Sequence, residues 1–228
     1  MKTFTFKKST LLFTMLSTFA VLITSCKKDE EIPPIVYGDA KFTVTNAVAA
    51  SGPQDFFQNT TKISTTAIAY GQTSQVLTVK AGSSDLYLKN EGTTTVTASL
   101  PVGLETDISY TTFYYASPVG KGLITGFAND QVAPAIAKVK VRFVNLGGLL
   151  TNPINVGIVG GSALNSNLGF GSATSYFTLD AGSAIEVAVL GTTKVTSIPT
   201  SSFVSGKIYT VWIDGTDFTA NAHVIQQN

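Results

Sequence analysis

The segment Ala137-Lys138-Val139-Lys140-Val141-Arg142-Phe143 alternates strictly between apolar and basic residues. A period of two is typical of a β-strand, because successive side chains of a strand point to opposite faces of a sheet. We therefore expect a half-buried strand here, with its valines and phenylalanine facing a core and its basic side chains facing outward.

This strand has a counterpart earlier in the chain. Residues 140–145 (KVRFVN) align with residues 41–46 (KFTVTN) at an offset of 99. Further blocks recur in the same order at an offset of 99 or 100: Tyr70-Gly71 with Phe170-Gly171, residues 77–83 with 177–183, residues 92–96 with 191–195, and Tyr110-Thr111 with Tyr209-Thr210. Self-similarity at a fixed period indicates a duplicated structural unit. The sequence thus predicts two copies of one domain, residues 39–130 and 137–228, joined by a linker at 131–136.

Each copy consists of short β-prone segments separated by glycine and asparagine. This spacing predicts an antiparallel sandwich or barrel, and no segment after the N-terminal leader has a sustained helical period. Residues 208–213 are apolar on both faces, so we expect a central strand there. Residues 80–83 and 180–183 are expected to form hairpin turns in which glycine takes a positive φ.

Several motifs of the second copy resemble a known family: residues 141–145 (VRFVN), 170–176 (FGSATSY), 180–182 (DAG) and 206–211 (GKIYTV). They are similar to the domain of unknown function DUF4397. The resemblance is good over about 137–228 and weaker over about 39–130, where Thr43 stands at the arginine position and Asp107 at that of Gly206. It implies an all-β fold of two tandem immunoglobulin-like antiparallel β-sandwich domains on secreted or lipid-anchored bacterial proteins. It implies no activity and no catalytic residue.

The N-terminus predicts export. Lys2, Lys7 and Lys8 precede a largely apolar run at 9–23, which is shorter than the about 20 residues that span a membrane and fits a signal peptide. The following Ile23-Thr24-Ser25-Cys26 resembles the lipobox of bacterial lipoproteins. The resemblance implies cleavage between Ser25 and Cys26, removal of residues 1–25, and acylation of Cys26, for example with palmitate. The chain has no second cysteine to form an intramolecular disulfide.

Residues 26–38 are interpreted as a charged and proline-containing tether. Its charged run, Lys27-Lys28-Asp29-Glu30-Glu31, is either a solvated spacer or an export signal, since it resembles the signal that sends lipoproteins of one group of Gram-negative bacteria to the cell surface. We expect an outer-membrane lipoprotein exposed on the cell surface and held by its N-terminal acyl chains, with the periplasmic face as the alternative.

Composition and motifs argue against nucleic-acid binding, metal binding and catalysis by this chain. The net charge of +1 offers no electrostatic case for nucleic acid, and the single histidine, His223, has no cysteine or second histidine with which to bind a metal. We interpret His223 as a surface or satisfied strand residue, although a Ser–His–acid triad with Asp214 or Asp217 is formally possible. The segment 213–217 (IDGTD) is interpreted as an Asp-Gly hairpin turn rather than a Ca²⁺ loop. No cofactor, metal or catalytic residue is predicted.

Aromatic residues are the remaining candidates for binding. Phe56-Phe57 and Phe113-Tyr114-Tyr115 place neighbouring rings on opposite faces of a strand, so some of them are expected to face outward and others to pack in the core, whereas Trp212 is expected in the core. We expect a non-enzymatic surface module that binds a glycan or a protein, through loops at one end of each sandwich. The alternatives are a structural or adhesive envelope component and, third, a hydrolase.

Overall fold

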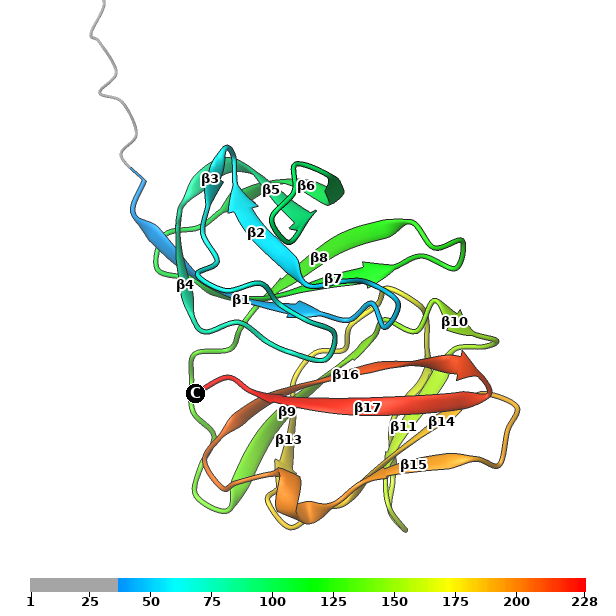
Figure 1. The fold of residues 1–228 in the computed structure, drawn as a ribbon. Coiled ribbons are helices and arrows are strands. Elements are labelled where there is room, and N and C mark those ends of the chain that lie inside the picture. Colours follow the sequence, from blue (N-terminus) through cyan, green and yellow to red (C-terminus); the bar gives the residue numbers. More distant parts are fainter. Residues whose placement is uncertain (1–36) are drawn as a thin grey trace, which may run out of the picture. The chain divides into compact units, whose positions relative to one another are not determined.

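The structure, a computed structural model, describes residues 37–228, which form β-strands and one short 3-10 helix, η1 (Thr200–Ser202) (Figure 1). The predicted all-β sandwich class is confirmed. The predicted signal peptide (1–25), the acylation site Cys26 and the export signal at 27–31 lie outside the described residues. Within residues 37–228, no helix combines the length and the apolar character needed to cross a membrane.

The first repeat, β1–β8, has two four-stranded sheets. Its inner sheet has the order β4-β1-β7-β8, with β4 (Leu77–Lys80), β1 (Asp39–Asn46), β7 (Ser109–Ala116) and β8 (Gly122–Ala128). Its outer sheet has the order β3-β2-β5-β6, with β3 (Thr61–Lys62), β2 (Gln54–Gln58), β5 (Gly82–Asn90) and β6 (Val96–Leu104). Phe42, Phe56 and Leu88 belong to the apolar core that the two sheets enclose.

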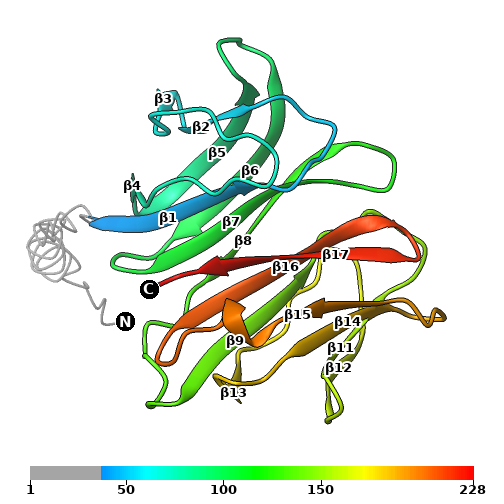
Figure 2. The ribbon, with the colours of Figure 1, turned by 60° about the horizontal axis from the view of Figure 1, so that its bottom comes forward.

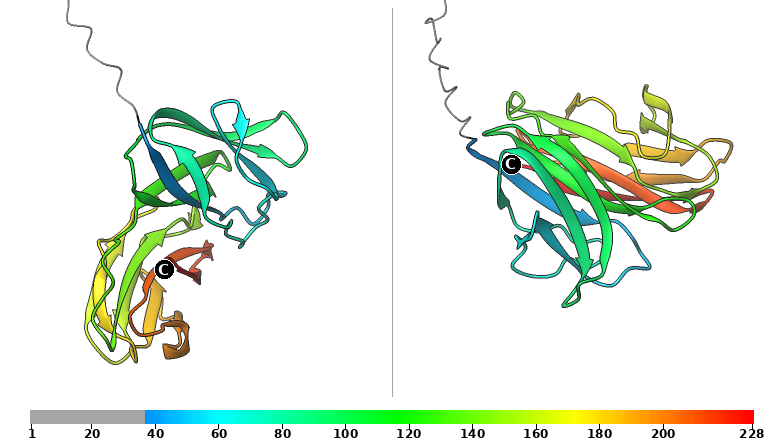
Figure 3. Two further views of the ribbon diagram at one scale, coloured as in Figure 1. Left: turned by 90° about the vertical axis from the view of Figure 1, so that its left-hand side faces the viewer. Right: turned by 90° about the horizontal axis from the view of Figure 1, so that it is seen from above.

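The second repeat, β9–β17, repeats this arrangement (Figure 3). Its inner sheet contains β10 (Leu149–Leu150), β16 (Ile208–Asp217), β9 (Lys138–Asn145) and β13 (Phe177–Asp180) in that order, and β17 (Thr219–Gln226) pairs with β16. Its outer sheet has the order β12-β11-β14-β15, with β12 (Ala163–Leu168), β11 (Ile154–Ile158), β14 (Ile185–Val189) and β15 (Val195–Ile198). Phe143, Val187 and Val211 belong to its core.

The strand directions differ from the expected antiparallel pattern at three strand pairs. β1 pairs with β7, β9 with β16, and the short β10 with β16, in parallel. The chain leaves β1, passes through the outer sheet and returns in β7, so the two central strands run the same way. Residues 208–213 lie in β16, between β9 and β17, which confirms the predicted central strand.

The segments 80–83 and 180–183 do not form the predicted hairpin turns. Residues 80–83 lead from β4 in the inner sheet to β5 in the outer sheet, so they form a corner between the two layers. Gly82 has the expected positive φ of 93°, but Gly182 is not among the residues with a positive φ. The shared sequence therefore marks a sheet-to-sheet corner.

The same hydrogen bonds recur in both repeats. The Nδ2 of Asn46 donates to the Ile68 carbonyl, and that of Asn145 donates to the Leu168 carbonyl. The hydroxyl of Tyr110 accepts from the Glu105 amide, as that of Tyr209 accepts from the Val204 amide. Asn46 and Asn145 are almost fully buried, so each amide must find partners on the backbone. These contacts explain why asparagine and tyrosine recur at the offset of 99.

The inner sheets of the two repeats pack face to face (Figures 1 and 2). An apolar cluster joins them, with Phe113 from β7, Val144 from β9 and Trp212 from β16. Trp212 is buried as expected, but it lies between the repeats rather than in the core of either one. Residues 37–228 form one compact unit, and the division into independent domains at 39–130 and 137–228 stays a prediction.

The expectation that basic side chains of β9 face outward is wrong for Arg142. Its side chain lies in the contact between the repeats and is 4% exposed. It donates hydrogen bonds to the Ala128 carbonyl, to Asn129 Oδ1 and to Thr210 Oγ1 at 2.8, 3.0 and 3.1 Å. The first repeat covers the face of β9 that would otherwise be solvated. Lys138 and Lys140 are only partly buried and form ion pairs with Asp180 and Asp130.

Candidate functional site: the cleft between the repeats

A cleft of about 600 Å³ opens where the two repeats meet. The β1–β2 loop and the β7–β8 turn form its wall on the first repeat, and the β9–β10 loop and the β16–β17 hairpin form its wall on the second. Side chains with hydrogen-bonding groups are numerous along it: Ser51, Tyr70, Asn90, Ser117, Asp214, Thr216 and Asn221. The cleft thus combines small apolar residues with several polar groups, which is the usual composition of a small-ligand site.

Tyr70 and Asp214 connect the two walls. The Tyr70 hydroxyl donates a hydrogen bond of 2.5 Å to Asp214 Oδ2. Burial raises the pKa of Tyr70 to about 12, and the hydrogen bond to Asp214 and its negative charge act in the same direction. Burial opposes ionisation of Asp214, but hydrogen bonds from His223, Tyr70 and Asn221 and the positive charge that His223 can carry outweigh it and lower the pKa of Asp214. The cleft therefore holds one fixed carboxylate.

His223 supports this carboxylate from the adjacent strand. Its ring stacks on Trp212 with the centroids 3.8 Å apart and the planes at 7°, and its Nε2 lies 3.1 Å from Asp214 Oδ1. The ring of Tyr70 meets both of these rings edge-on. The structure thus brings together His223 and Asp214, two of the three members that a Ser–His–acid triad requires. In the described part of the chain, however, no hydrogen bond joins a serine to His223, and the third side chain of the cluster is Tyr70.

The Asp-Gly turn predicted at Asp214-Gly215 is wrong. Both residues lie within β16, and the hairpin turns at Asp217, whose φ is 51°. Gly215 is required for a different reason, because a Cβ on it would lie 2.1 Å from the Thr219 carbonyl oxygen. Asp214 faces the first repeat, whereas Asp217 is exposed at the turn. Across residues 37–228, no three His, Cys, Asp or Glu side chains are grouped so as to hold a metal ion.

The sequence singled out His223 and Asp214 but missed Tyr70. Tyr70 is the first-repeat counterpart of Phe170, and each of the two residues directly precedes a glycine. Phe170 also reaches across the contact, where its ring lies 5.6 Å from that of Tyr115, the counterpart of Asp214. The two contacts are therefore related by the duplication. The hydroxyl that distinguishes Tyr70 from Phe170 is the one signal that the sequence offered.

The aromatic pairs divide between the faces as expected. Phe56 is fully buried in the core of the first repeat, whereas Phe57 is only partly buried on the outer face of β2. Tyr114 lies in the same core, while Phe113 and Tyr115 lie in the contact between the repeats. Phe57 is thus the ring of these pairs that the outer sheet presents.

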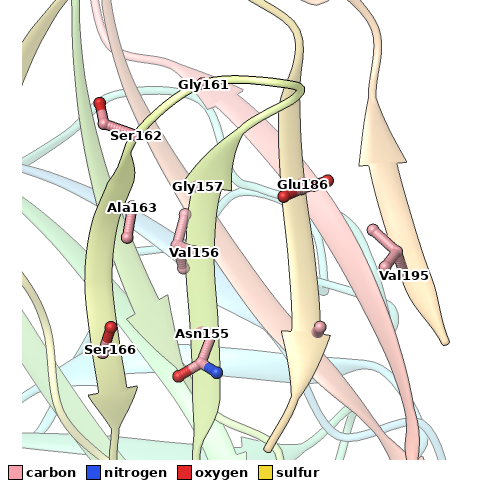
Figure 4. A pocket seen from close by; sticks show the side chains of 10 residues that line it. Asn155, Val156, Gly157, Gly161, Ser162, Ala163, Ser166, Glu186 and Val195 are labelled. Atoms are coloured by element: carbon pink, nitrogen blue, oxygen red, sulfur yellow. The ribbon is translucent and has the colours of Figure 1, made fainter. Parts of the chain in front are cut away.

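A second hollow, of about 260 Å³, lies on the outer sheet of the second repeat (Figure 4). Asn155 and Gly157 on β11, Ser166 on β12 and Glu186 on β14 line it. It exists because β11 carries glycine at a position where most residues would place a side chain over the sheet.

Comparison with known proteins gives a match to one family model and matches to several distant solved structures. The domain of unknown function DUF4397 matches residues 40–148, which run from β1 through β9. The match therefore covers the copy whose motifs are more diverged, together with the first strand of the other copy. No curated protein matches the chain.

Two of these solved structures are similar at low scores. One is a family 26 carbohydrate-binding module of Amy13K from Eubacterium rectale in complex with maltoheptaose, with 13% identity over 83% of this chain and 97% of that chain and a TM-score of 0.26. The other is a candidate cell adhesion protein from Bacteroides uniformis, with 10% identity over 85% of this chain and 98% of that chain and a TM-score of 0.27. Scores this low carry no argument about the site or its ligand.

Proposed function

We propose that this protein is a lipid-anchored, surface-exposed binding module of the outer membrane without enzymatic activity, and that both repeats are DUF4397 domains. Cys26 carries the anchor, and the tether at 26–38 presents the folded part. Mass spectrometry of the native protein tests the anchor: an acylated N-terminal Cys26 is expected, and an unmodified thiol with residues 1–25 still attached would refute it. Protease accessibility on intact cells distinguishes the outer face from the periplasmic one.

The observation that carries the binding role is the cleft between the repeats. Its walls offer the half-exposed ring of Tyr70 and the amides of Asn90 and Asn221, together with the Asp214 carboxylate. A ring beside amide and carboxylate groups suits a neutral ligand rich in hydroxyl groups, such as an oligosaccharide, because the ring contacts its apolar face and the polar groups bond its hydroxyls. The Asp214 side chain is already committed to Tyr70 and His223, so it orients the site rather than acting as a general acid.

A glycan array followed by titration calorimetry tests this role. The exposed residue Ala50 lines the cleft, so Ala50→Trp should fill the cleft and abolish binding without disturbing a core. The matched control is Val204→Trp, which places the same ring on an exposed position outside the cleft and should leave binding unchanged. Failure of every glycan to bind, or equal binding by the Ala50→Trp variant, would contradict the proposed site.

A further inference from the structure

The segment that joins the two repeats is apolar and exposed. Residues 132–137 (VAPAIA) carry no polar side chain, and all of them except Pro134 are exposed. Ile136 is 93% exposed and Val132 is 69% exposed. Single apolar residues on a surface are normal, whereas a contiguous exposed apolar stretch marks a place where another surface binds. This segment therefore calls for a partner that covers it.

Hydrogen bonds hold this segment in one conformation. Lys140 Nζ donates to the Val132 carbonyl at 2.8 Å, and the Ala137 amide donates to Ser205 Oγ at 2.8 Å. The second of these bonds brings the segment beside the loop that carries Val204, which is itself 57% exposed. An apolar surface that is already ordered loses little conformational freedom when it binds.

The apolar base, which we define as residues 132–137 together with Val204, lies at the end of the molecule opposite the cleft. β1 begins at Asp39, close to the point where the N-terminal segment joins the folded part, and β9 begins directly after the apolar segment. Figure 2 shows these two strands beginning on the same side of the molecule. The loops that follow the two strands, residues 47–52 and 146–149, line the cleft.

Most charged side chains beside the apolar base are paired. Lys138 and Lys140 form ion pairs with Asp180 and Asp130 at 2.7 and 2.5 Å. Lys207 follows in the chain shortly after Val204, and no ion pair engages it within the described residues.

The adjoining loop of the first repeat is acidic. Gln131 Nε2 donates to the Asp107 carbonyl, and both Glu105 and Asp107 are exposed. In residues 37–228, neither carboxylate forms an ion pair. The unpaired charges near the apolar base thus have both signs, so a contact there depends on the burial of apolar side chains and not on net charge.

We propose that the apolar base rests on the surface of a lipid bilayer, so that the cleft at the other end faces away from the bilayer. The inference rests on the proposed lipid anchor at Cys26. The chain between that anchor and the folded part, residues 26–36, reaches at most about 40 Å when fully extended. The end that carries the base is therefore held near the bilayer, where a high local concentration strengthens a weak contact.

A dye on the apolar base tests the proposal in a protein that is attached to vesicles without acylation. Residues 26–228 with Cys26→Ser carry an N-terminal histidine tag, which binds nickel-chelating lipid in phosphatidylcholine vesicles. Ile136→Cys carries the environment-sensitive dye nitrobenzoxadiazole. Its emission should shift to shorter wavelength, and acyl-chain spin labels should quench about half of it, because the dye enters the boundary between headgroups and acyl chains.

The matched control is Val119→Cys with the same dye. Val119 is 89% exposed in the turn between β7 and β8, at the end that carries the cleft, so neither the shift nor the quenching is expected there. Equal quenching at positions 119 and 136, or no quenching at position 136, would overturn the proposal.

A further variant tests whether the apolar side chains make the contact. With the dye at Val204→Cys, the added change Ile136→Asp should reduce quenching about twofold, because a carboxylate resists transfer out of water. Ile136 is 93% exposed, so this change leaves the fold intact. Unchanged quenching would contradict the apolar contact, and quenching that requires added phosphatidylglycerol would assign the contact to charge instead.

Two other outcomes are distinguishable. A spectral shift without quenching that grows with the density of protein on the vesicle would assign the apolar base to a second copy of the chain and overturn the proposal. Mass spectrometry of Cys26 in the native protein reports the anchor separately. Failure of acylation and failure of bilayer contact are therefore read from different measurements.

Discussion

Asn46 and Asn145 stand at equivalent positions of the two repeats and bond the backbone in the same way, whereas Thr43 and Arg142, at the same spacing, have different surroundings. Thr43 is partly exposed on β1, and Arg142 is buried against the other repeat. Two further pairs at equivalent positions also differ in their side chains and surroundings: Tyr70 and Phe170, and Phe57 on β2 and Gly157 on β11. The comparison teaches that the duplication kept the contacts that close each sandwich and changed those that each repeat presents outward.

The contact between the repeats is itself built from equivalent residues. Phe113 and Trp212 occupy the same position of β7 and β16 and lie 6.4 Å apart, centroid to centroid. Thr111 and Thr210 likewise correspond, and Gln227 Nε2 donates to both of their hydroxyls, at 3.0 and 2.6 Å. Such self-complementary pairing is typical of a two-fold symmetric dimer. The tandem chain thus resembles a dimer whose two copies were joined and then diverged.

The largest loss of stability is expected when either ring at the centre of the contact between the repeats, Phe113 or Trp212, is truncated. Phe113→Ala and Trp212→Ala should each lower the free energy of unfolding by about 3–5 kcal/mol, because both side chains are almost fully buried and truncation leaves a cavity. Urea denaturation of residues 37–228 measures the effect, with Val119→Ala, at 89% exposure, as the control. A loss well below this for either ring, or two separate transitions in the parent protein, would show that the repeats fold independently.

A second test exchanges the residues that differ at one equivalent position. Arg142→Thr should lower the free energy of unfolding by about 3 kcal/mol, because it removes three hydrogen bonds from a charged donor and the packing of the guanidinium on the rings of Phe127 and Tyr176. The reverse change, Thr43→Arg, is expected to stay within about 0.5 kcal/mol of the parent, since Thr43 is partly exposed. Denaturation curves of both variants check the asymmetry, and equal losses would contradict it.

The strands, and the likeness in strand order between the two halves of the chain, were predictable because their signals are local or periodic. The alternation at 137–143 reports a strand, and the offset of 99 or 100 reports the repeat, without knowledge of the tertiary contacts. The alternation also separates the two faces of β9, but it does not say what covers each face. For this reason the pattern predicts a solvated Arg142 and a Trp212 inside a sandwich core, whereas both lie against the other repeat.

The candidate site was less predictable because its members are distant in sequence. Tyr70 and Asp214 are 144 residues apart, and no local pattern relates them. The parallel pairing of β1 with β7 follows from a crossover through the outer sheet, which strand propensity does not report. The hollow on the outer sheet of the second repeat depends on a missing side chain at Gly157, and a glycine in a strand has several explanations.

The smallest expected effects concern the pair Tyr70–Asp214, which the other contact, Phe170–Tyr115, lacks. The pKa of Asp214 lies below its ordinary value of 3.8, so the stability it adds is present above that value and is lost as the pH falls through the lower pKa of the folded state. The pKa of Tyr70 is raised from 10.0 to about 12, so the stability it adds is present below pH 10.0 and is lost as the pH rises towards about 12.

The free energy of unfolding, measured by urea denaturation at several pH values across these two ranges, tests the pair. Asp214→Asn should reduce the loss of stability at acid pH, and Tyr70→Phe should reduce the loss at alkaline pH. Each change should be less than about 1 kcal/mol, because Tyr70 is 36% exposed and solvent screens the interaction. The matched control is Phe170→Tyr, which adds a hydroxyl at the equivalent position, where Tyr115 rather than a carboxylate faces it. If the control changes the pH profile as much as Tyr70→Phe does, the profile reports a general tyrosine effect, and the carboxylate is not what distinguishes the two contacts.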